Sequence, residues 1–296
     1  MTRTYRWVLL TAVCGILATM ACPAPAVAAE KINVLIVDGQ NNHNWKATTP
    51  VLKKLLLKTG RFSVDVATTP DRGAKKEAWE AFRPNFAKYD VVLSNYTGTG
   101  WPKEVNEAFT QYMAKGGGLV FYHAAVFAFP RWKEWNQMMG MGWRGNGYGD
   151  RLTVDDAGEV VRTPKGKGPG GGHGPAHPFE MTVRDKDHAV MKGMPAKWMH
   201  VKDELYHGMR GPAKDIHILA TAFSDKKKGG TGTNEPMVWT VPVGKGRVLV
   251  SLLGHDGGSI SAPGAAVVLT RGVEWAATGK VTLPVPKDVS AAAETK

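Results

Sequence analysis

Residues 115–125 read KGGGLVFYHAA, and this stretch decides the fold. The glycines end a helix, because residues 105–113 before them carry apolar side chains at helical spacing. The apolar residues 118–122 have the length of a buried strand, which ends at His123 with two alanines behind it. Ligands of open α/β sheets bind at the carboxyl ends of the strands. The stretch therefore predicts an α/β fold with His123 at an edge of the sheet where ligands bind.

The sequence on both sides of this stretch alternates between strand and helix patterns. Strands are expected at residues 31–37, 61–67, 89–93 and 118–122, and helices from Thr48 or Thr49, from Lys75 and from Pro102. This alternation is typical of a parallel sheet with right-handed crossover connections. Four further strands are expected at residues 179–183, 216–223, 237–241 and 247–252, and two further helices at residues 131–139 and 262–277. Residues 140–178 are rich in Gly and Pro, and such a long irregular segment is usually functional or disordered.

The first 29 residues are expected to be a secretory signal peptide that is not part of the fold. Arg3 and Arg6 give a positive start, residues 7–20 are mostly apolar, and residues 26–28 form a small-residue cleavage site. The apolar part is too short for a comfortable membrane span. These features predict that the mature protein is periplasmic or secreted.

The mature chain is expected to be one α/β domain at residues 30–281 followed by a flexible C-terminal tail at residues 282–296. A lipoprotein anchored through Cys22 is the less favoured alternative, since Thr19 stands where such signals carry an aliphatic residue. No second stretch of about 18 apolar residues follows the signal, so the mature protein is expected to be soluble, without a membrane segment.

Composition removes several kinds of chemistry. Both cysteines, Cys14 and Cys22, lie in the expected signal, so the mature chain has no disulfide, no thiolate metal site and no cysteine nucleophile. The chain carries a formal charge of +12, and a basic surplus can attract nucleic acid or anionic surfaces. The densest basic run, residues 226–228, is typical of a polar loop, and an exported protein rarely meets nucleic acid. Nucleic acid is therefore not an expected partner.

Two motifs of familiar enzymes are incomplete in this chain. Residues 98–100 read Gly-Thr-Gly between a strand and a helix, but the third glycine of a dinucleotide-binding loop and the acidic residue for the ribose are missing. No nucleotide cofactor is therefore expected. The strand-to-turn position that presents the nucleophile in Gly-x-Ser-x-Gly enzymes holds His123, with no Ser or Cys beside it. This disfavours acyl-enzyme chemistry of the usual kind.

Histidine and carboxylate side chains remain as candidates for chemistry. Three of the nine histidines fall within or beside regular elements and are expected to be structural: His188, His200 and His217. His173, in the glycine-rich run, is ambiguous. Four more fall in loops at strand ends or beside the long irregular segment: His43, His123, His177 and His255. Residues 203–206, Asp-Glu-Leu-Tyr, add two carboxylates and a phenol.

These residue types fit two roles, and the sequence leaves both open. Imidazole nitrogens with a carboxylate can bind a divalent metal, and the candidate ligand set is His43, His123, His177 and His255. Imidazole also has an ordinary pKa that suits a general base near neutral pH. No compact ligand motif such as His-Glu-x-x-His is present. A divalent metal is thus one expected cofactor, and metal-free acid–base chemistry is the alternative.

Taken together, several segments resemble the ThuA-like (trehalose utilisation) family. They occur in the order of that family, at residues 38–45, 89–92, 116–125, 177–178, 203–206, 244–247, 253–255 and 271–276. The resemblance implies a fold similar to class I glutamine amidotransferases, which is a flavodoxin-like, mostly parallel sheet with helices on both faces. It also implies that His123 stands where an amidotransferase has its cysteine, so amidotransferase activity is not implied. The chain departs from the family by its glycine-rich insert at residues 164–174.

The resemblance further implies a role in sugar catabolism, including the processing of 3-keto glycosides. The expected protein is an enzyme that acts on a sugar or keto-sugar by elimination, isomerisation or hydrolysis. The expected catalytic residues are His123, His255, Glu204 and Tyr206. The expected substrate-binding residues are Asp38, His43, Trp45, Tyr96 and Trp101, with Trp143 as a further aromatic. The expected partner is a small carbohydrate, a homo-oligomer is compatible with the sequence, and the alternative function is a non-enzymatic carbohydrate-binding or partner-binding protein.

Overall fold

The computed structural model of the chain describes residues 30–291 together with residues 1, 2 and 4. Apart from these three positions, the predicted signal peptide lies outside the described residues, as do the last residues of the predicted tail, 292–296. No helix in the described part of the chain combines the length and hydropathy of a membrane span. Export of the protein stays a prediction.

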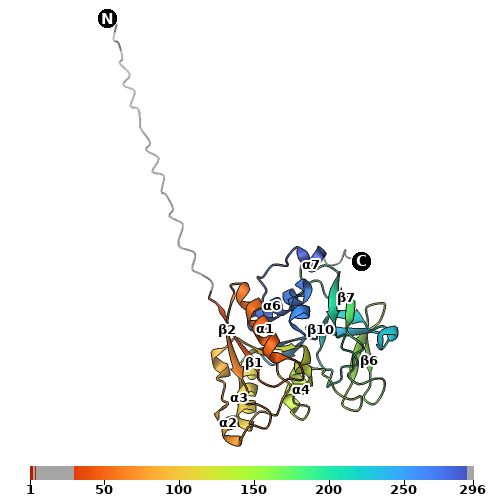
Figure 1. Cartoon of the computed structure of the whole chain (residues 1–296). Coiled ribbons are helices and arrows are strands. Elements are labelled where there is room, and N and C mark those ends of the chain that lie inside the picture. Colours follow the sequence, from red (N-terminus) through yellow and green to blue (C-terminus); the bar gives the residue numbers. More distant parts are fainter. Residues whose placement is uncertain (3, 5–29, 292–296) are drawn as a thin grey trace. The chain divides into compact units, whose positions relative to one another are not determined.

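Five parallel strands form the first half of the sheet (Figure 1). They lie in the order β2-β1-β3-β4-β11, with parallel pairing at every step. Their bounds are Ile32–Asp38 (β1), Phe62–Thr68 (β2), Val91–Ser94 (β3), Gly118–Tyr122 (β4) and Gly246–Ser251 (β11). This is the strand order of flavodoxin-like folds, and it brings the carboxyl ends of all five strands to one edge. The fold class predicted from the sequence is confirmed.

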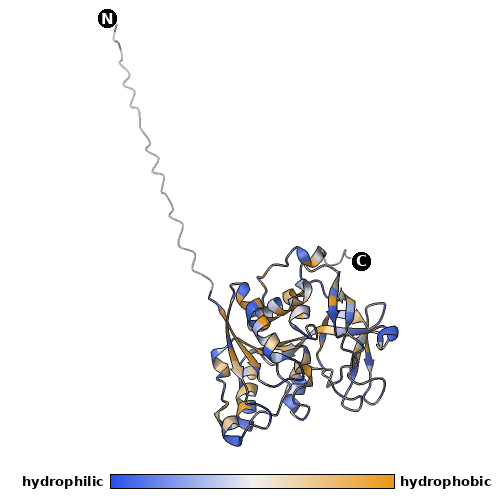
Figure 2. Cartoon of the chain, viewed as in Figure 1, coloured by the Kyte–Doolittle hydropathy of each residue, from blue (hydrophilic) through white to orange (hydrophobic). Residues whose placement is uncertain are grey.

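Helices flank this half of the sheet, and their ribbons carry both apolar and polar residues (Figure 2). The long helix α6 (Pro263–Thr278) packs on β3, β4 and β11 and contacts α1 (Trp45–Lys58) and α5 (Gly257–Ser261). Two further helices, α3 (Lys103–Ala114) and α4 (Lys133–Met139), pack against β11. The strands β1, β3, β4 and β11 are mostly apolar runs because they are covered on both faces, whereas the edge strand β2 alternates buried and exposed residues at its start.

The start of α1 differs from the prediction. The helix begins at Trp45, because the side chain of Asn44 caps it by accepting a hydrogen bond of 3.2 Å from the Ala47 N–H. The predicted caps, Thr48 and Thr49, lie inside the helix and are buried. The predicted helix from Lys75 is also shorter than expected: it forms α2 (Lys76–Ala81), and a 3₁₀ turn (Phe86–Lys88) follows later.

The second half of the sheet is antiparallel and continues from β11. The order is β10-β9-β7-β8, and a hairpin of β5 and β6 joins through β10. The bounds are Arg151–Val154 (β5), Val160–Thr163 (β6), His177–Val183 (β7), Lys197–Asp203 (β8), His217–Phe223 (β9) and Asn234–Val243 (β10). The sequence did not predict β5, β6 or β8. The edge strand β8 alternates exposed and buried residues instead of forming an apolar run, and this pattern made it harder to recognise.

The chain after α6 packs where the sequence predicts a loose tail. The backbone N–H groups of Thr282 and Leu283 donate to Oε2 of Glu274 at 2.8 and 3.0 Å. Val289, in the short helix α7 (Asp288–Ala291), is fully buried. The carboxylate of α6 therefore holds this segment against the domain.

Candidate functional site

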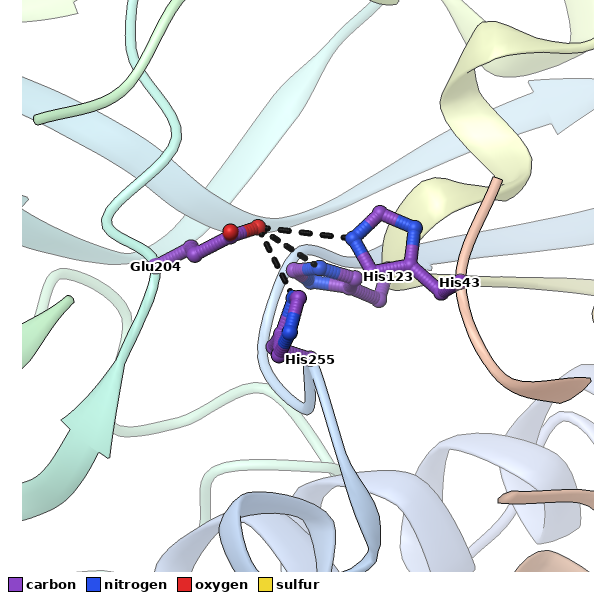
Figure 3. Close-up of side chains that lie close together, drawn as sticks. All are labelled: His43, His123, Glu204 and His255. Carbon is purple, nitrogen blue, oxygen red and sulfur yellow. Dashed lines mark hydrogen bonds and ion pairs between the residues drawn. The ribbon is translucent and has the colours of Figure 1, made fainter. Parts of the chain in front are cut away.

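Three histidines meet at the carboxyl edge of the parallel strands. His43 follows β1, His123 follows β4 and His255 follows β11 (Figure 3). The centroid of the His43 ring lies 4.9 Å from that of His123 and 4.5 Å from that of His255. The centroids of His123 and His255 are 5.7 Å apart. The flavodoxin-like order places the ends of these strands side by side, so residues more than two hundred positions apart become neighbours.

Glu204 enters the same space from the antiparallel half, directly after β8 (Figure 3). Its Oε2 atom lies 3.4 Å from Nε2 of His43, 3.6 Å from Nε2 of His123 and 3.0 Å from Nδ1 of His255. One nitrogen of each ring and one oxygen of Glu204 all lie within 4.8 Å of one another. The three imidazoles and the carboxylate thus point at a common centre.

The backbone at His123 fixes the direction of its ring. The residue has a φ of 42°, a conformation that is unusual for a side chain of this size, and a 3₁₀ turn (His123–Phe127) follows it. The Nδ1 atom donates to the carbonyl oxygen of Leu252 at 2.6 Å, since a carbonyl can only accept. In the neutral ring the lone pair therefore lies on Nε2, which faces Glu204.

A polar network at the ends of β1 and β3 holds the loop of His43. The side chain of Asn41 accepts from the backbone N–H of His43 at 2.9 Å and donates to Oδ1 of Asn95 at 3.0 Å. Asn95 in turn donates to the hydroxyl groups of Thr48 and Thr49, both at 3.1 Å. The buried threonines thus support the loop rather than cap the helix.

Asp203 organises both Glu204 and His255 through their backbones. Its Oδ1 atom accepts from the N–H of Glu204 at 2.9 Å and of His255 at 3.0 Å. Its Oδ2 atom accepts from the N–H of Gly254 at 2.7 Å and from Nε2 of His200 at 2.8 Å. Burial by itself would raise the pKa of Asp203, but the contact with His200 and the neighbouring donors outweigh it and lower that pKa. Asp203 is thus an ionised anchor behind the site.

Aromatic side chains form one wall of the site. Tyr206 is buried, its hydroxyl lies 3.4 Å from Nε2 of His43, and its ring lies 4.4 Å from the ring of His123. Trp143 meets Tyr206 edge-on at 4.8 Å and stacks on Phe127 at 4.5 Å. Burial, together with the nearby carboxylates, raises the pKa of Tyr206, so its hydroxyl keeps its proton near neutral pH.

The charges of the site favour an ionised Glu204 and a neutral His43. Burial opposes the ionisation of Glu204, but the surrounding imidazoles outweigh it and lower the pKa of Glu204. Burial lowers the pKa of His43, and the two neighbouring imidazoles act in the same direction. The side-chain exposures are 1% for His123, 11% for His43, 15% for Glu204 and 40% for His255, so solvent reaches the site mainly from the side of His255.

The donor atoms present fit a divalent cation. Nε2 of His123 and Nδ1 of His255 are buried and lack a hydrogen-bond partner among the described residues. A buried polar atom without a partner is costly unless something else satisfies it. Three imidazole nitrogens with one carboxylate oxygen are a ligand set that suits zinc and other divalent first-row metals. The cluster can therefore hold a metal ion through His43, His123, Glu204 and His255.

The structure brings together five of the residues predicted from the sequence: His43, His123, Glu204, Tyr206 and His255. It corrects the predicted metal set, because His177 is not part of the cluster. Its Nδ1 atom lies 2.9 Å from the carbonyl oxygen of Pro175, and its ring packs on Phe179. Glu204 joins the three remaining histidines in the group that could hold an ion.

The other predicted substrate contacts have partners of their own. Tyr96 and Trp101 are buried in an aromatic cluster, where each packs against Phe129, so neither has a free face for a sugar. Asp38 is buried and accepts from the hydroxyl of Thr68 at 2.7 Å, and burial raises its pKa. Trp45, the first residue of α1, is half-buried and carries the ammonium group of the next residue, Lys46, 5.5 Å from its ring.

The sequence did not assign His173 to the site, and it predicted structural roles for His188, His200 and His217. His173, ambiguous in sequence, lies with Nε2 3.6 Å from Oε1 of Glu204. Its only sequence signal was its position in the glycine-rich insert by which this chain departs from the family. His200 supports Asp203, and the rings of His188 and His217 pack on each other at 5.6 Å, so these three have structural contacts.

Comparison with known proteins gives the family. A family model described as trehalose utilisation, ThuA, matches residues 33–276. A ThuA-like protein from Parabacteroides merdae is 43% identical over 88% of this chain and 94% of its own, and its structure superposes with a TM-score of 0.83. A ThuA-like protein from Bacteroides uniformis is 21% identical over 88% of this chain and 97% of its own, with a TM-score of 0.57, which shows likeness of fold alone. No curated protein matches the chain.

Proposed function

The chain belongs to the ThuA (trehalose utilisation) family and has a carbohydrate-related role, and from this premise we propose that it is an exported enzyme acting on a sugar or 3-keto-glycoside. One observation carries the proposal: three imidazoles and a carboxylate converge at the carboxyl edge of the parallel strands. Perturbed groups gathered at such an edge are typical of a catalytic site. The proposed reaction is an elimination, an isomerisation or a hydrolysis. It is not an amidotransfer, because His123 occupies the position after the strand where an amidotransferase has its catalytic cysteine.

A keto-sugar gives these residues defined tasks. A carbonyl group acidifies the proton on the neighbouring carbon, so the enzyme needs a base for that proton and a donor for the oxygen that gains charge. His255 is the most exposed imidazole of the cluster, and Glu204 lies 3.0 Å from its Nδ1 atom. In a site without a metal ion, we assign the role of base to His255, with Glu204 stabilising the imidazolium that forms, and His123 is the alternative base. With an ion bound, these side chains would be its ligands instead.

The other residues orient and protect the reacting groups. Tyr206 keeps its proton and can donate it as a hydrogen bond to a sugar oxygen. The hydrogen bond from Nδ1 of His123 to Leu252 keeps the Nε2 lone pair directed at the centre of the site. In the alternative to base catalysis by these side chains, His43, His123, His255 and Glu204 would hold a divalent ion, which would supply Lewis-acid chemistry for a sugar carbonyl.

The test is a metal analysis of the purified protein followed by assays with 3-ketotrehalose and trehalose. We expect about one divalent ion per chain and turnover of the oxidised disaccharide, since only the oxidised sugar has an acidified C–H bond. Turnover of neither sugar by the metal-loaded protein would argue against the enzyme.

Single alanine variants separate the enzyme from a protein that only binds carbohydrate. His123→Ala and His255→Ala should still bind the sugar and lose turnover by roughly 100-fold or more. His177→Ala is the matched control, because its ring lies outside the cluster. A protein that binds the disaccharide equally well in all forms and never turns it over would support the alternative, non-enzymatic function.

A further inference from the structure

A fourth imidazole faces the second oxygen of Glu204. Nε2 of His173 lies 3.6 Å from Oε1, whereas the three histidines of the cluster face Oε2. The ring of His173 is nearly parallel to that of Tyr206, with centroids 5.7 Å apart, and its side chain is 35% exposed. His173 is therefore open to solvent beside the carboxylate, and it is not among the residues whose atoms can share one ion.

The hydrogen bonds of His173 define what it can offer to a ligand. Its Nδ1 atom donates to the carbonyl oxygen of Gly174 at 2.7 Å, so in the neutral ring Nε2 is an acceptor. Oε1 of Glu204 is an acceptor as well. Two acceptors side by side cannot satisfy each other, but they suit a ligand that brings two donors. Neighbouring hydroxyl groups on a sugar ring supply two O–H donors at a comparable spacing.

The segment that carries His173 is built around a buried arginine. Arg210 has no exposed surface, and its guanidinium donates only to backbone carbonyl groups. The acceptors are Gly149, Thr163, Pro164, Lys167 and Pro169, with the contacts to Pro169 at 2.7 and 2.8 Å. Four of these five carbonyls belong to residues 163–169, so the chain wraps around the guanidinium group.

The glycines of this segment serve close packing. The N–H of Gly172 donates to the carbonyl of His207 at 3.0 Å, and the N–H of His207 returns a bond of 2.8 Å. A side chain at Gly171 would meet the ring of Trp143 at 2.9 Å. The glycine-rich insert, residues 164–174, is therefore ordered by its packing. Its glycines allow close contact with neighbouring backbone and rings.

We propose that Nε2 of His173 and Oε1 of Glu204 form a binding subsite for two neighbouring hydroxyl groups of a carbohydrate, and that Arg210 positions this subsite. His173 touches the ligand, and Arg210 acts through residues 163–169. The inference rests on the proposed function only in that the ligand is a carbohydrate. It requires neither turnover nor a bound ion.

The first test compares binding of trehalose and its monodeoxy derivatives by NMR titration. Derivatives that lack either hydroxyl of the recognised pair should bind the native protein roughly tenfold more weakly than trehalose. His173→Phe keeps a ring against Tyr206 and removes the acceptor, so it should lose about the same factor for trehalose and should no longer distinguish one of these derivatives. His177→Phe is the matched control and should behave like the native protein.

The outcomes separate this inference from the proposed function. Unchanged trehalose binding by His173→Phe would overturn the subsite, even in a protein that turns over 3-ketotrehalose. Loss of Co²⁺ binding by the same variant would also overturn it, since His173 would then be a metal ligand. The native protein could lack turnover while its trehalose binding still depends on His173. That result would refute the proposed enzymatic function and leave the subsite intact. A native protein that binds no trehalose would overturn the subsite.

The second test addresses Arg210 by limited trypsin digestion of Arg210→Lys. A lysine keeps the charge but cannot reach five carbonyls, so the peptide bonds after Lys165 and Lys167 should be cut roughly tenfold faster. Trehalose binding should weaken to the level of His173→Phe. Arg247→Lys is the control, because Arg247 also donates only to carbonyls, at the end of α6. Unchanged cleavage in Arg210→Lys would show that Arg210 does not position the segment.

Discussion

Glu204 and Glu274 are two carboxylates with little exposed surface and very different surroundings. Glu274 accepts hydrogen bonds from Thr282 N–H at 2.8 Å, Thr282 Oγ1 at 2.5 Å and Leu283 N–H at 3.0 Å, and it pairs with Nε of Arg61 at 3.2 Å. These donors join α6 to two other parts of the chain, the segment that follows it and the distant Arg61. Every contact has the length of an ordinary hydrogen bond, so this corner of the domain is electrostatically complete.

Glu204 shows the opposite arrangement. Four imidazoles surround it at 3.0–3.6 Å, yet Nε2 of His123 and Nδ1 of His255 have no hydrogen-bond partner among the described residues. Folding brought these groups together as ion pairs, but the hydrogen bond between His43 and Oε2 of Glu204 is long, at 3.4 Å. The comparison teaches that convergence alone does not mark a functional site. At Glu204 the buried imidazole nitrogens that lack a partner converge on one carboxylate, and an ion or ligand at their centre would satisfy them.

The largest expected effect is that of Glu204→Gln on the site. Removing the only carboxylate of the cluster should weaken Co²⁺ binding by roughly 100-fold or more and lower turnover of 3-ketotrehalose by a similar factor. The free energy of unfolding should change by less than about 1 kcal/mol, because the carboxylate makes few good hydrogen bonds. Calorimetric titration and urea unfolding measure the two effects. A large loss of stability with intact metal binding would show that Glu204 is a structural carboxylate and not the functional one.

Glu274→Gln is the matched substitution in the other region, and its effect should fall on stability. Breaking the pair with Arg61 and weakening the bonds from Thr282 should cost about 2 kcal/mol of unfolding free energy. Co²⁺ binding should stay within twofold of the native value, roughly the error of such a titration. Urea unfolding at neutral pH measures the first effect. Equal stability of variant and native protein would mean that this corner does not hold the end of the chain.

The dependence of this difference on pH sharpens the comparison. Burial alone would raise the pKa of Glu274, but the donors around it outweigh burial and lower that pKa. A lowered pKa contributes stability that is fully present above the unfolded-state pKa, about 4.3, and is lost as the pH falls through the folded-state value. The gap between native protein and Glu274→Gln should therefore be constant from pH 7 to about pH 5 and shrink at lower pH. A gap that does not change with pH would exclude an ionised Glu274 as its cause.

The sequence predicted the parallel half of the sheet better than the antiparallel half. In β1, β3, β4 and β11 both faces are covered, so each strand is an apolar run that stands out between polar helices. The strands β6 and β8 lack that signal, because much of their surface faces water. The strand β5 is buried, but its four residues include Arg151 and Thr153 and do not form an apolar run. Residues 165–174 looked structureless because their order comes from Arg210, which lies about forty positions away.

The site followed the same division. His43, His123 and His255 stand at the ends of predictable strands, so strand order alone brings them together. Glu204 could be named from its family motif, but its role as the fourth ligand depends on β8, which the sequence did not predict. His177 was chosen over His173 because it flanks the long irregular segment, whereas His173 lies inside the glycine-rich insert and was ambiguous. In the structure it is His173 that reaches Glu204, while Nδ1 of His177 turns to the carbonyl oxygen of Pro175.

The smallest expected effect separates two tyrosines that the sequence assigned to the site, Tyr206 as a catalytic residue and Tyr96 as a substrate contact. Tyr206→Phe removes a hydroxyl that lies 3.4 Å from Nε2 of His43, so turnover of 3-ketotrehalose should fall by about tenfold while Co²⁺ binding is kept. Tyr96→Phe removes a hydroxyl that donates to the carbonyl of Thr99 at 2.6 Å in the aromatic core, so it should cost about 1 kcal/mol of stability and no turnover. Steady-state kinetics and thermal unfolding of both variants decide this. If Tyr96→Phe lost turnover and Tyr206→Phe lost only stability, the tyrosine that contacts the substrate would be Tyr96 and not Tyr206.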